Sequence, residues 1–265
     1  MTDKENLLVQ LYKELNIGKS DVCLSCQEKN PELTKPVTAW FVGEHFDIQS
    51  PKILFVGKTA RGVPGDEVDG VIQAFDMSRD GLWFTNWPYW SYTRAICQEI
   101  FGSDDLENIA FTNMVKCNSS PTIDTTSELM KQNCICNLKV IQKEVELIKP
   151  ELIIAYTGYA YDQSWKSVFD VFDVQCDEKR KIGEKMMPWL EAQVMLNGQK
   201  MNFLRVGHPE RMKKVDYVHN VDDCCDILEY CLFEHHQFRF SSFHPMCHDA
   251  YRALMGEIRC QNTDC

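Results

Sequence analysis

The chain has 265 residues, of which 44% are hydrophobic and 25% are charged, and its formal net charge is −11. These proportions are those of a folded globular protein, and the length suffices for one large α/β domain or two small ones. The net charge excludes a generally basic nucleic-acid binder. It does not exclude a local basic cleft, because phosphate binding depends on the local potential.

No apolar run approaches the roughly 18–20 residues that a membrane-spanning helix needs. The first residues, Met1–Glu5, do not show the basic-then-apolar pattern of a signal peptide, so we expect a cytoplasmic monomer with no membrane partner. The chain contains thirteen cysteines, an odd number. In a reducing compartment this count favours metal ligation over a disulfide framework.

The hydrophobic pattern changes repeatedly between the periods of helices and strands. In chain order it predicts a helix at 3–16, strands at 37–42 and 53–56, a helix at 95–101 and a strand at 109–115. It then predicts a long helix at 128–149, a strand at 152–156, a mixed and partly helical insertion at 162–193, a strand at 203–206, and helices at 221–233 and 249–258. This alternation predicts a single α/β domain over 1–265.

The strand at 109–115 delivers Asn113, Lys116 and Cys117 to its carboxyl end. In α/β sheets ligands bind in the crevice beyond the carboxyl ends of the strands. An amide presents one acceptor and two donors in a plane, which suits the edge of a nucleobase. The competing interpretation of a lone asparagine is a turn former.

The cysteines suggest a metal site. Cys23 and Cys26 form a Cys-x2-Cys clip, and Cys117 together with Cys134 or Cys136 would complete a set of four thiolates. Such a set fits a [4Fe–4S] cluster, and zinc is the competing metal. Ordinary buried thiols without a metal are the remaining alternative.

The segment after the 203–206 strand combines a histidine with cations. His208 at a strand end can donate a hydrogen bond to charge that develops on a leaving group. The following residues predict DNA contacts, as phosphate ligands or as a wedge between bases: Arg211, Met212, Lys213 and Lys214. The alternative is a solvated loop with an incidental histidine.

Two further segments carry candidate residues. Tyr89, in the aromatic segment 82–92, can stack on an extruded base, although such aromatics also fill cores. Asp66, Glu67 and Asp69, in the glycine-rich loop 57–70, can position water or stabilise a sugar cation. Solvated loop acids are the alternative for these three carboxylates.

In their order, these motifs resemble the uracil-DNA glycosylase superfamily, and most closely its iron–sulfur branch, family four. The matching segments are the Cys23-x2-Cys26 clip, the strand Lys52–Gly57, Pro88-Tyr89, the segment Thr112–Cys117, the helix end Ile148-Lys149-Pro150 with the strand Leu152–Ala155, and His208-Pro209. The match covers about residues 20–215 and implies a three-layer α/β/α fold with a central parallel sheet. Residues from about 216 to 265 would form a Cys/His-rich helical extension.

The resemblance implies a DNA glycosylase that flips a pyrimidine-type base and hydrolyses its N-glycosidic bond to leave an abasic site. In that interpretation Gly57 opens the first active-site loop, Tyr89 stacks on the base, Asn113 reads its edge and His208 stabilises the leaving base. One of the loop acids, with Asp66 preferred, acts on water or on the sugar cation. The cluster would be structural.

The chain departs from the family at the substrate loops. The usual Gly-Glu-Ala-Pro-Gly is replaced by Gly57-Lys58-Thr59-Ala60-Arg61-Gly62, Trp90 and Ser91 stand where small residues are usual, and Glu210-Arg211 follows His208-Pro209. We therefore expect a modified pyrimidine, such as a decorated phage cytosine, and a role in antiviral defence. The alternatives are a uracil-DNA glycosylase of DNA repair and a non-catalytic nucleic-acid-binding protein on the same fold.

The fourth cluster ligand has two candidates. Cys134 fits the family spacing counted from Cys117, and Cys136 fits it counted back from Pro150. Two residues rotate a helical side chain by about 200°, and insertions are tolerated better in a loop than in a helix. This argument favours Cys136.

Overall fold

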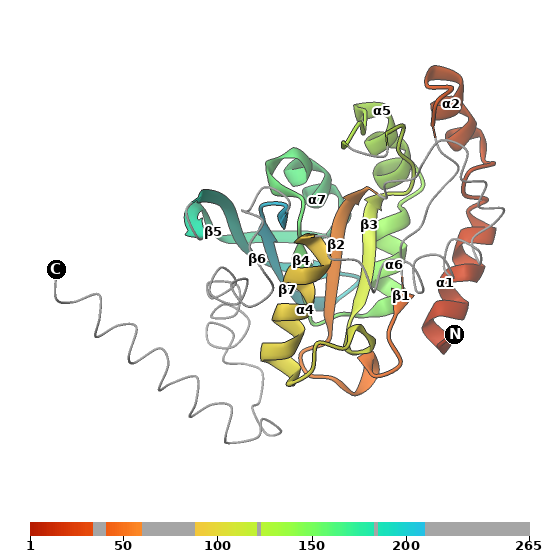
Figure 1. The fold of residues 1–265 in the computed structure, drawn as a ribbon. Helices are drawn as coiled ribbons and strands as arrows, with labels where there is room; N and C mark the ends of the chain where they lie inside the picture. The colour runs from red at the N-terminus through yellow and green to blue at the C-terminus, as the bar shows by residue number, and fades with distance from the viewer. Residues whose placement is uncertain (34–40, 60–87, 121–122, 183–184, 210–265) are drawn as a thin grey trace, which may run out of the picture.

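The fold is given by a computed structural model that describes residues 1–33, 41–59, 88–120, 123–182 and 185–209. Its centre is a seven-stranded sheet in the order β1-β3-β2-β4-β7-β6-β5 (Figure 1). The strands are β1 Phe41–Val42, β2 Ile53–Thr59, β3 Ala110–Val115, β4 Leu152–Ala155, β5 Val171–Ile182, β6 Lys185–Leu196 and β7 Gln199–Val206. Within the described ranges, no helix combines the length and apolarity needed to cross a bilayer.

The middle of the sheet is parallel. Strands β3, β2, β4 and β7 pair in parallel, whereas β1, β6 and β5 pair antiparallel with their neighbours. The residues of β4 and the first five of β2 are all buried, as expected for parallel strands covered on both faces. The predicted α/β class is therefore confirmed, and the sheet as a whole is mixed.

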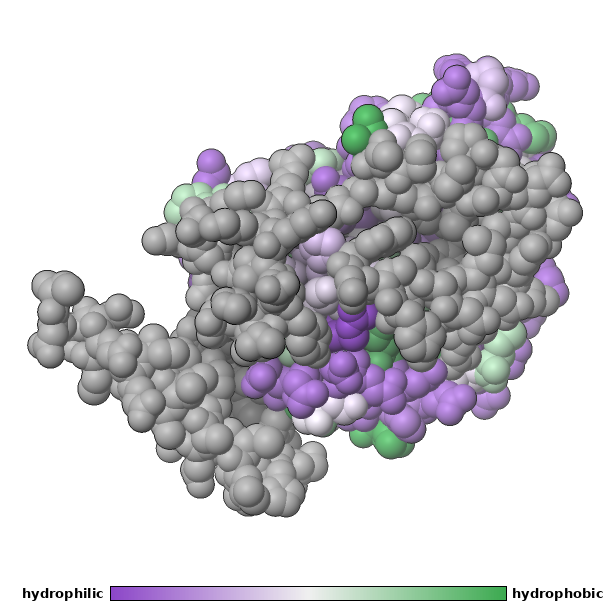
Figure 2. All heavy atoms as spheres, in the orientation of Figure 1, coloured by the Kyte–Doolittle hydropathy of each residue, from purple (hydrophilic) through white to green (hydrophobic). Residues whose placement is uncertain are grey.

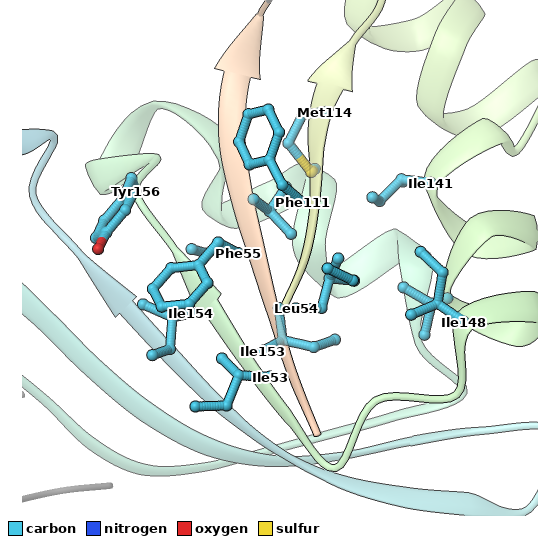
Figure 3. Close-up of a cluster of buried hydrophobic side chains, with 14 of the residues drawn as sticks. Ile53, Leu54, Phe55, Phe111, Met114, Ile141, Ile148, Ile153, Ile154 and Tyr156 are labelled. Atoms are coloured by element: carbon cyan, nitrogen blue, oxygen red, sulfur yellow. The ribbon is translucent and has the colours of Figure 1, made fainter. Parts of the chain in front are cut away.

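Helices cover both faces of the sheet. On one face, Tyr89 and Trp90 of α4 (Pro88–Phe101) pack against Phe111, with ring centres 5.2 and 4.7 Å away. On the other face, Glu144 of α6 (Val140–Ile148) accepts a hydrogen bond from Thr112. Consecutive strand residues point to opposite faces, so Phe111 and Thr112 mark the two sides. Figure 3 shows the resulting core, with α6 side chains on one side of the strands and aromatic rings on the other.

Most predicted elements are confirmed with small shifts of their ends. The helix at 3–16 is α1 (Asp3–Glu14), which packs on α6, and the helix at 95–101 begins earlier, as α4. The strands at 53–56, 109–115, 152–156 and 203–206 are β2, β3, β4 and β7. Only the last two residues of the predicted strand 37–42 are described, as β1. The helices predicted at 221–233 and 249–258 lie outside the described residues.

The prediction of one helix over 128–149 is wrong. This stretch forms α5 (Glu128–Lys131), the π-helix η4 (Gln132–Asn137) and α6, and Lys139 between them has a left-handed φ of 55°. The side-chain amide of Asn133 donates to the carbonyl of Val22 and to the hydroxyl of Ser25, both at 3.0 Å. These tertiary hydrogen bonds join η4 to α2 (Asp21–Lys29), and hydrophobic periodicity carries no sign of them.

The insertion at 162–193 is mixed and partly helical, as predicted. Among its described residues, α7 (Asp162–Val168) is the helix, and β5 and β6 form an antiparallel hairpin that continues the sheet. The side chains of β5 are mostly exposed and many are charged, which obscures the strand pattern and suits a sheet edge. The Asn197-Gly198 turn between β6 and β7, with φ of 48° and 78°, is a hairpin signal that the sequence does contain.

A buried polar network joins α1, β3 and α6. The Lys116 amine lies 2.8 Å from the Glu144 carboxylate, and both side chains are almost fully buried. Glu144 also accepts hydrogen bonds from the Tyr12 hydroxyl and from Thr112. Elsewhere the described surface is mostly hydrophilic in the view of Figure 2, with its apolar residues scattered singly.

Candidate functional site

Three predicted residues meet at the carboxyl ends of β2 and β3. Gly57 pairs with Asn113 in the parallel register of these strands. A Cβ atom placed on Gly57 would lie 2.2 Å from Asn113 Oδ1 and 3.5 Å from Tyr89 Cε2. The missing side chain of Gly57 is therefore what leaves room for the Asn113 amide beside the Tyr89 ring.

Tyr89 is held at the start of α4 by other aromatic rings. Its ring centre lies 4.8 Å from that of Tyr156 and 5.2 Å from that of Phe111, edge to face in both cases. Burial, and secondarily the charge of Tyr156, raises the pKa of the Tyr89 hydroxyl, which therefore stays neutral. Among the described residues, this buried hydroxyl has no hydrogen-bond partner. Buried polar groups are normally paired, so this hydroxyl is an exception among the described residues.

His208 extends the group of site residues. It follows the end of β7, and its ring centre lies 5.9 Å from that of Tyr89. His208 also lines a cavity of about 740 Å³ formed at the ends of β2, β4 and β7 and by β6. The lining residues used below are Lys58, Thr157, Tyr159, Met187, Pro188 and His208. This is the crevice position in which α/β sheets bind ligands.

The cavity differs in charge from the chain as a whole. Its described lining contains Lys58 and His208 and no carboxylate, in a protein of net charge −11. The Lys58 amine lies 3.9 Å from the Asp124 carboxylate, which is the limit of an ion pair. A cleft with these side chains can accept a phosphate or another electron-rich group on an acidic protein.

All five candidate cysteines belong to segments that pack together, namely α2, the end of β3 and η4. Cys23 and Cys26 are buried on α2, and Asn133, next to Cys134 in η4, donates a 3.1 Å hydrogen bond to Cys26 Sγ. Cys134 is buried and interacts with the backbone of Lys116, the residue before Cys117.

Electrostatics shows the same grouping. Burial raises the pKa of the Cys117 thiol, and Cys134, Cys23 and Cys26 raise it further. Burial likewise raises the pKa of Cys134 to about 11, with contributions from Cys23 and Cys26. These contributions agree with the packing of α2 and β3 against η4. The Cys117 and Cys134 thiols are therefore protonated at neutral pH unless a metal takes the place of the protons.

Cys136, which the sequence argument preferred, lies elsewhere in the same helix. It is half-buried, and its Sγ atom is 3.7 Å from the Ser167 hydroxyl on α7. The spacing counted back from Pro150 assumes a regular helix, and the π-helix η4 and the left-handed φ of Lys139 interrupt it. In the described part of the chain, no three His, Cys, Asp or Glu side chains are close enough to hold a single metal ion.

Seven predicted site residues are not placed. They are Asp66, Glu67, Asp69, Arg211, Met212, Lys213 and Lys214, and all lie outside the described residues. Conversely, the structure adds Tyr159 and Arg205, which the sequence argument did not consider. Arg205 is a charged residue in the last apolar strand, and this was the available signal.

The comparisons with known proteins add no candidate function. No protein-family model and no curated protein matches this chain. The function is therefore inferred from the geometry and chemistry of the site.

Proposed function

We propose that this protein is a DNA glycosylase that flips a pyrimidine-type nucleotide and hydrolyses its N-glycosidic bond. The observation that carries the proposal is the meeting of Asn113, Tyr89 and Gly57 at one point, with His208 beside Tyr89. An amide for the edge of a base, a ring for its face and a donor for its leaving charge are the groups that this reaction needs.

The proposed roles follow the movement of charge. The bond between the base nitrogen and the sugar carbon breaks, and its electron pair leaves with the base. His208 donates a hydrogen bond to the negative charge that arrives there, while Asn113 holds the edge of the base and Tyr89 its face. Water adds to the sugar cation and loses a proton. Asp66, or else Glu67 or Asp69, is proposed to position that water.

We further propose a modified pyrimidine as the substrate. Lys58 stands where the family that the chain resembles has an acid, and it lines the cavity beside His208. The cavity volume of about 740 Å³ favours a base that carries a substituent. Decorated cytosines of phage DNA are bases of this kind, and their removal would serve antiviral defence. The two alternative functions are a repair enzyme that acts on uracil and a non-catalytic DNA-binding protein. The test below distinguishes them from the proposed function.

The test uses anaerobically purified protein and duplexes that contain thymine, uracil, cytosine, 5-hydroxymethylcytosine or its glucosylated form. Abasic sites are scored as strand breaks after alkali, and we expect breaks only with a decorated cytosine. Gly57→Ala should abolish them, because its Cβ would lie 2.2 Å from Asn113 Oδ1 and displace the amide.

Gly102→Ala is the control, since it strains a left-handed position after α4 without meeting any atom within 4 Å. It should keep activity. Breaks confined to uracil would make the protein a repair enzyme. Tight DNA binding without breaks on any duplex would refute catalysis and would support the alternative of a non-catalytic DNA-binding protein.

The four cysteines Cys23, Cys26, Cys117 and Cys134 are proposed to bind a [4Fe–4S] cluster. All four are at least partly buried, and they come from α2, the end of β3 and η4. A four-iron cluster lies between its thiolates and holds them farther apart than a single zinc ion does, which suits thiols that interact without forming a single-ion site. These residues would tie α2 to the end of the strand that carries Asn113. Loading would release protons, because the thiols must ionise to bind.

Two matched serine variants test this ligand set. Cys134→Ser is expected to lose most of the iron and the visible absorption of anaerobically purified protein, whereas Cys136→Ser is expected to keep both. Iron content and the absorption spectrum measure the outcome without any assay of activity. Loss of iron and of absorption in Cys136→Ser but not in Cys134→Ser would show that Cys136 is the fourth ligand. If the wild-type protein is colourless and contains zinc, the metal bound by these cysteines is zinc and not an iron–sulfur cluster.

A further inference from the structure

Tyr159 forms a wall of the cavity beside His208. It belongs to the 3-10 helix Gly158–Tyr161, directly after β4, and 48% of its surface is exposed. The guanidinium carbon of Arg205 lies 4.6 Å from the centre of its ring. The Arg205 guanidinium therefore covers one face of the Tyr159 ring.

Arg205 is fixed in this position. Its side chain is fully buried, and Nε and Nη2 each donate a 3.0 Å hydrogen bond to one carboxylate oxygen of Asp162. Nη2 also donates to Asp177 Oδ1 at 3.3 Å. The two-pronged contact holds the guanidinium plane, and a planar guanidinium stacks well on an aromatic face. The Tyr159 ring is thus backed by a rigid support.

A ring held in this way is a prepared binding surface. Little side-chain entropy remains to be lost when a ligand covers its open face, so more of the contact energy appears as affinity. Aromatic rings of this kind supply most of the apolar lining of ligand pockets, and a few polar groups near them set the orientation. The polar side chains in the described lining of the same cavity include Lys58 and His208.

The cavity adjoins the proposed base site at His208. His208 lines the cavity, and its ring centre lies 5.9 Å from that of Tyr89, so a substituent on a base held by Asn113 and Tyr89 would enter the cavity past His208. The volume of about 740 Å³ lies in the range of roughly 300–1,000 Å³ that accommodates drug-sized ligands. This is more than an unsubstituted pyrimidine ring can fill.

We propose that Tyr159 is a specificity-determining residue whose open face holds a bulky polar substituent, of the size of a hexose, on the flipped pyrimidine. The apolar face of such a sugar would lie on the ring, and its hydroxyls would reach Lys58. Arg205 and Asp162 are positioning residues that act through Tyr159. The inference rests on the proposed function, because it assigns the substrate class of the same site.

The test compares the affinities of two duplexes that differ at one position, glucosylated 5-hydroxymethylcytosine or cytosine. We expect wild-type protein to prefer the decorated duplex. Tyr159→Ala should reduce this preference at least about tenfold, the size of a lost stacking contact, and leave the affinity for plain duplex unchanged. Tyr159→Phe should keep the preference, since it retains the ring. Asp162→Asn should reduce the preference by a smaller factor, because it weakens the support of Arg205.

The other outcomes overturn the inference. A wild-type protein without preference, or a Tyr159→Ala variant that retains it, would show that the ring does not meet the substituent. An equal loss of affinity for both duplexes would place a neighbouring nucleotide on Tyr159 instead. Base release is measured on the same duplexes, and its absence in wild-type protein would refute the glycosylase while the affinity ratio still decides the role of Tyr159.

Discussion

Replacement of His208 by alanine is expected to lower the rate of base release by about 10²–10³-fold, the usual cost of removing one donor to a developing negative charge. His208 lies at the end of β7, next to Tyr89 and on the cavity. In the proposed reaction its hydrogen bond strengthens as charge moves onto the leaving base. The ground-state duplex lacks that charge, so the affinity for DNA should change little.

The measurement is a single-turnover time course on the best substrate of the duplex panel, paired with an equilibrium binding titration. His45→Ala is the matched control, because His45 is an exposed residue at the start of the 3-10 helix Phe46–Ile48 and should leave both quantities unchanged. Parallel losses of rate and affinity would make His208 a binding residue. An unchanged rate of base release would show that His208 takes no part in the reaction.

Glu144→Leu is expected to lower the free energy of unfolding by about 3–5 kcal/mol, because it leaves the Lys116 ammonium buried without its counter-charge. The Tyr12 and Thr112 hydroxyls would lose an acceptor in the same step. For a chain of this size the change corresponds to a fall in melting temperature of roughly 6–20 °C. Thermal unfolding followed by circular dichroism measures it.

Two controls separate the buried pair from ordinary ion pairs. The double variant Lys116→Met with Glu144→Leu should recover much of the loss, since no unpaired charge then remains in the core. Glu128→Ala removes the exposed carboxylate that pairs with Lys131 and should change stability by less than about 1 kcal/mol. A Glu144→Leu variant as stable as this control would show that the network does not hold α1, β3 and α6 together.

Local pattern was a reliable guide where a segment is buried in a regular way. The apolar runs of β2 and β4 and the 3.6-residue period of α1 identify these elements because their side chains meet a uniform environment. The same reasoning led to Tyr89, Asn113 and His208, and the family resemblance added Gly57. Their convergence is a consequence of the parallel β2–β3 register and of the aromatic packing around Tyr89.

Pattern was misleading where contacts between distant segments override the local preference. The charged sequence of β5 forms a strand because β6 supplies its hydrogen bonds, and the helix after Glu128 opens into a π-helix where Asn133 bonds to α2. The thiol spacing from Pro150 was counted through this same irregular stretch. Cys134, and not Cys136, faces the α2 cysteines once the helical count is broken.

The sequence by itself determined the α/β class, the positions of the main strands along the chain and the residue types at their carboxyl ends, because hydrophobic period and chain direction are local properties. Only the tertiary structure decided which of these side chains meet. The closeness of Gly57 to Asn113, the grouping of Cys134 with Cys23 and Cys26, and the stacking of Arg205 on Tyr159 all join segments far apart in the chain. Such contacts depend on strand register, helix irregularity and buried charge, which no single stretch of sequence specifies.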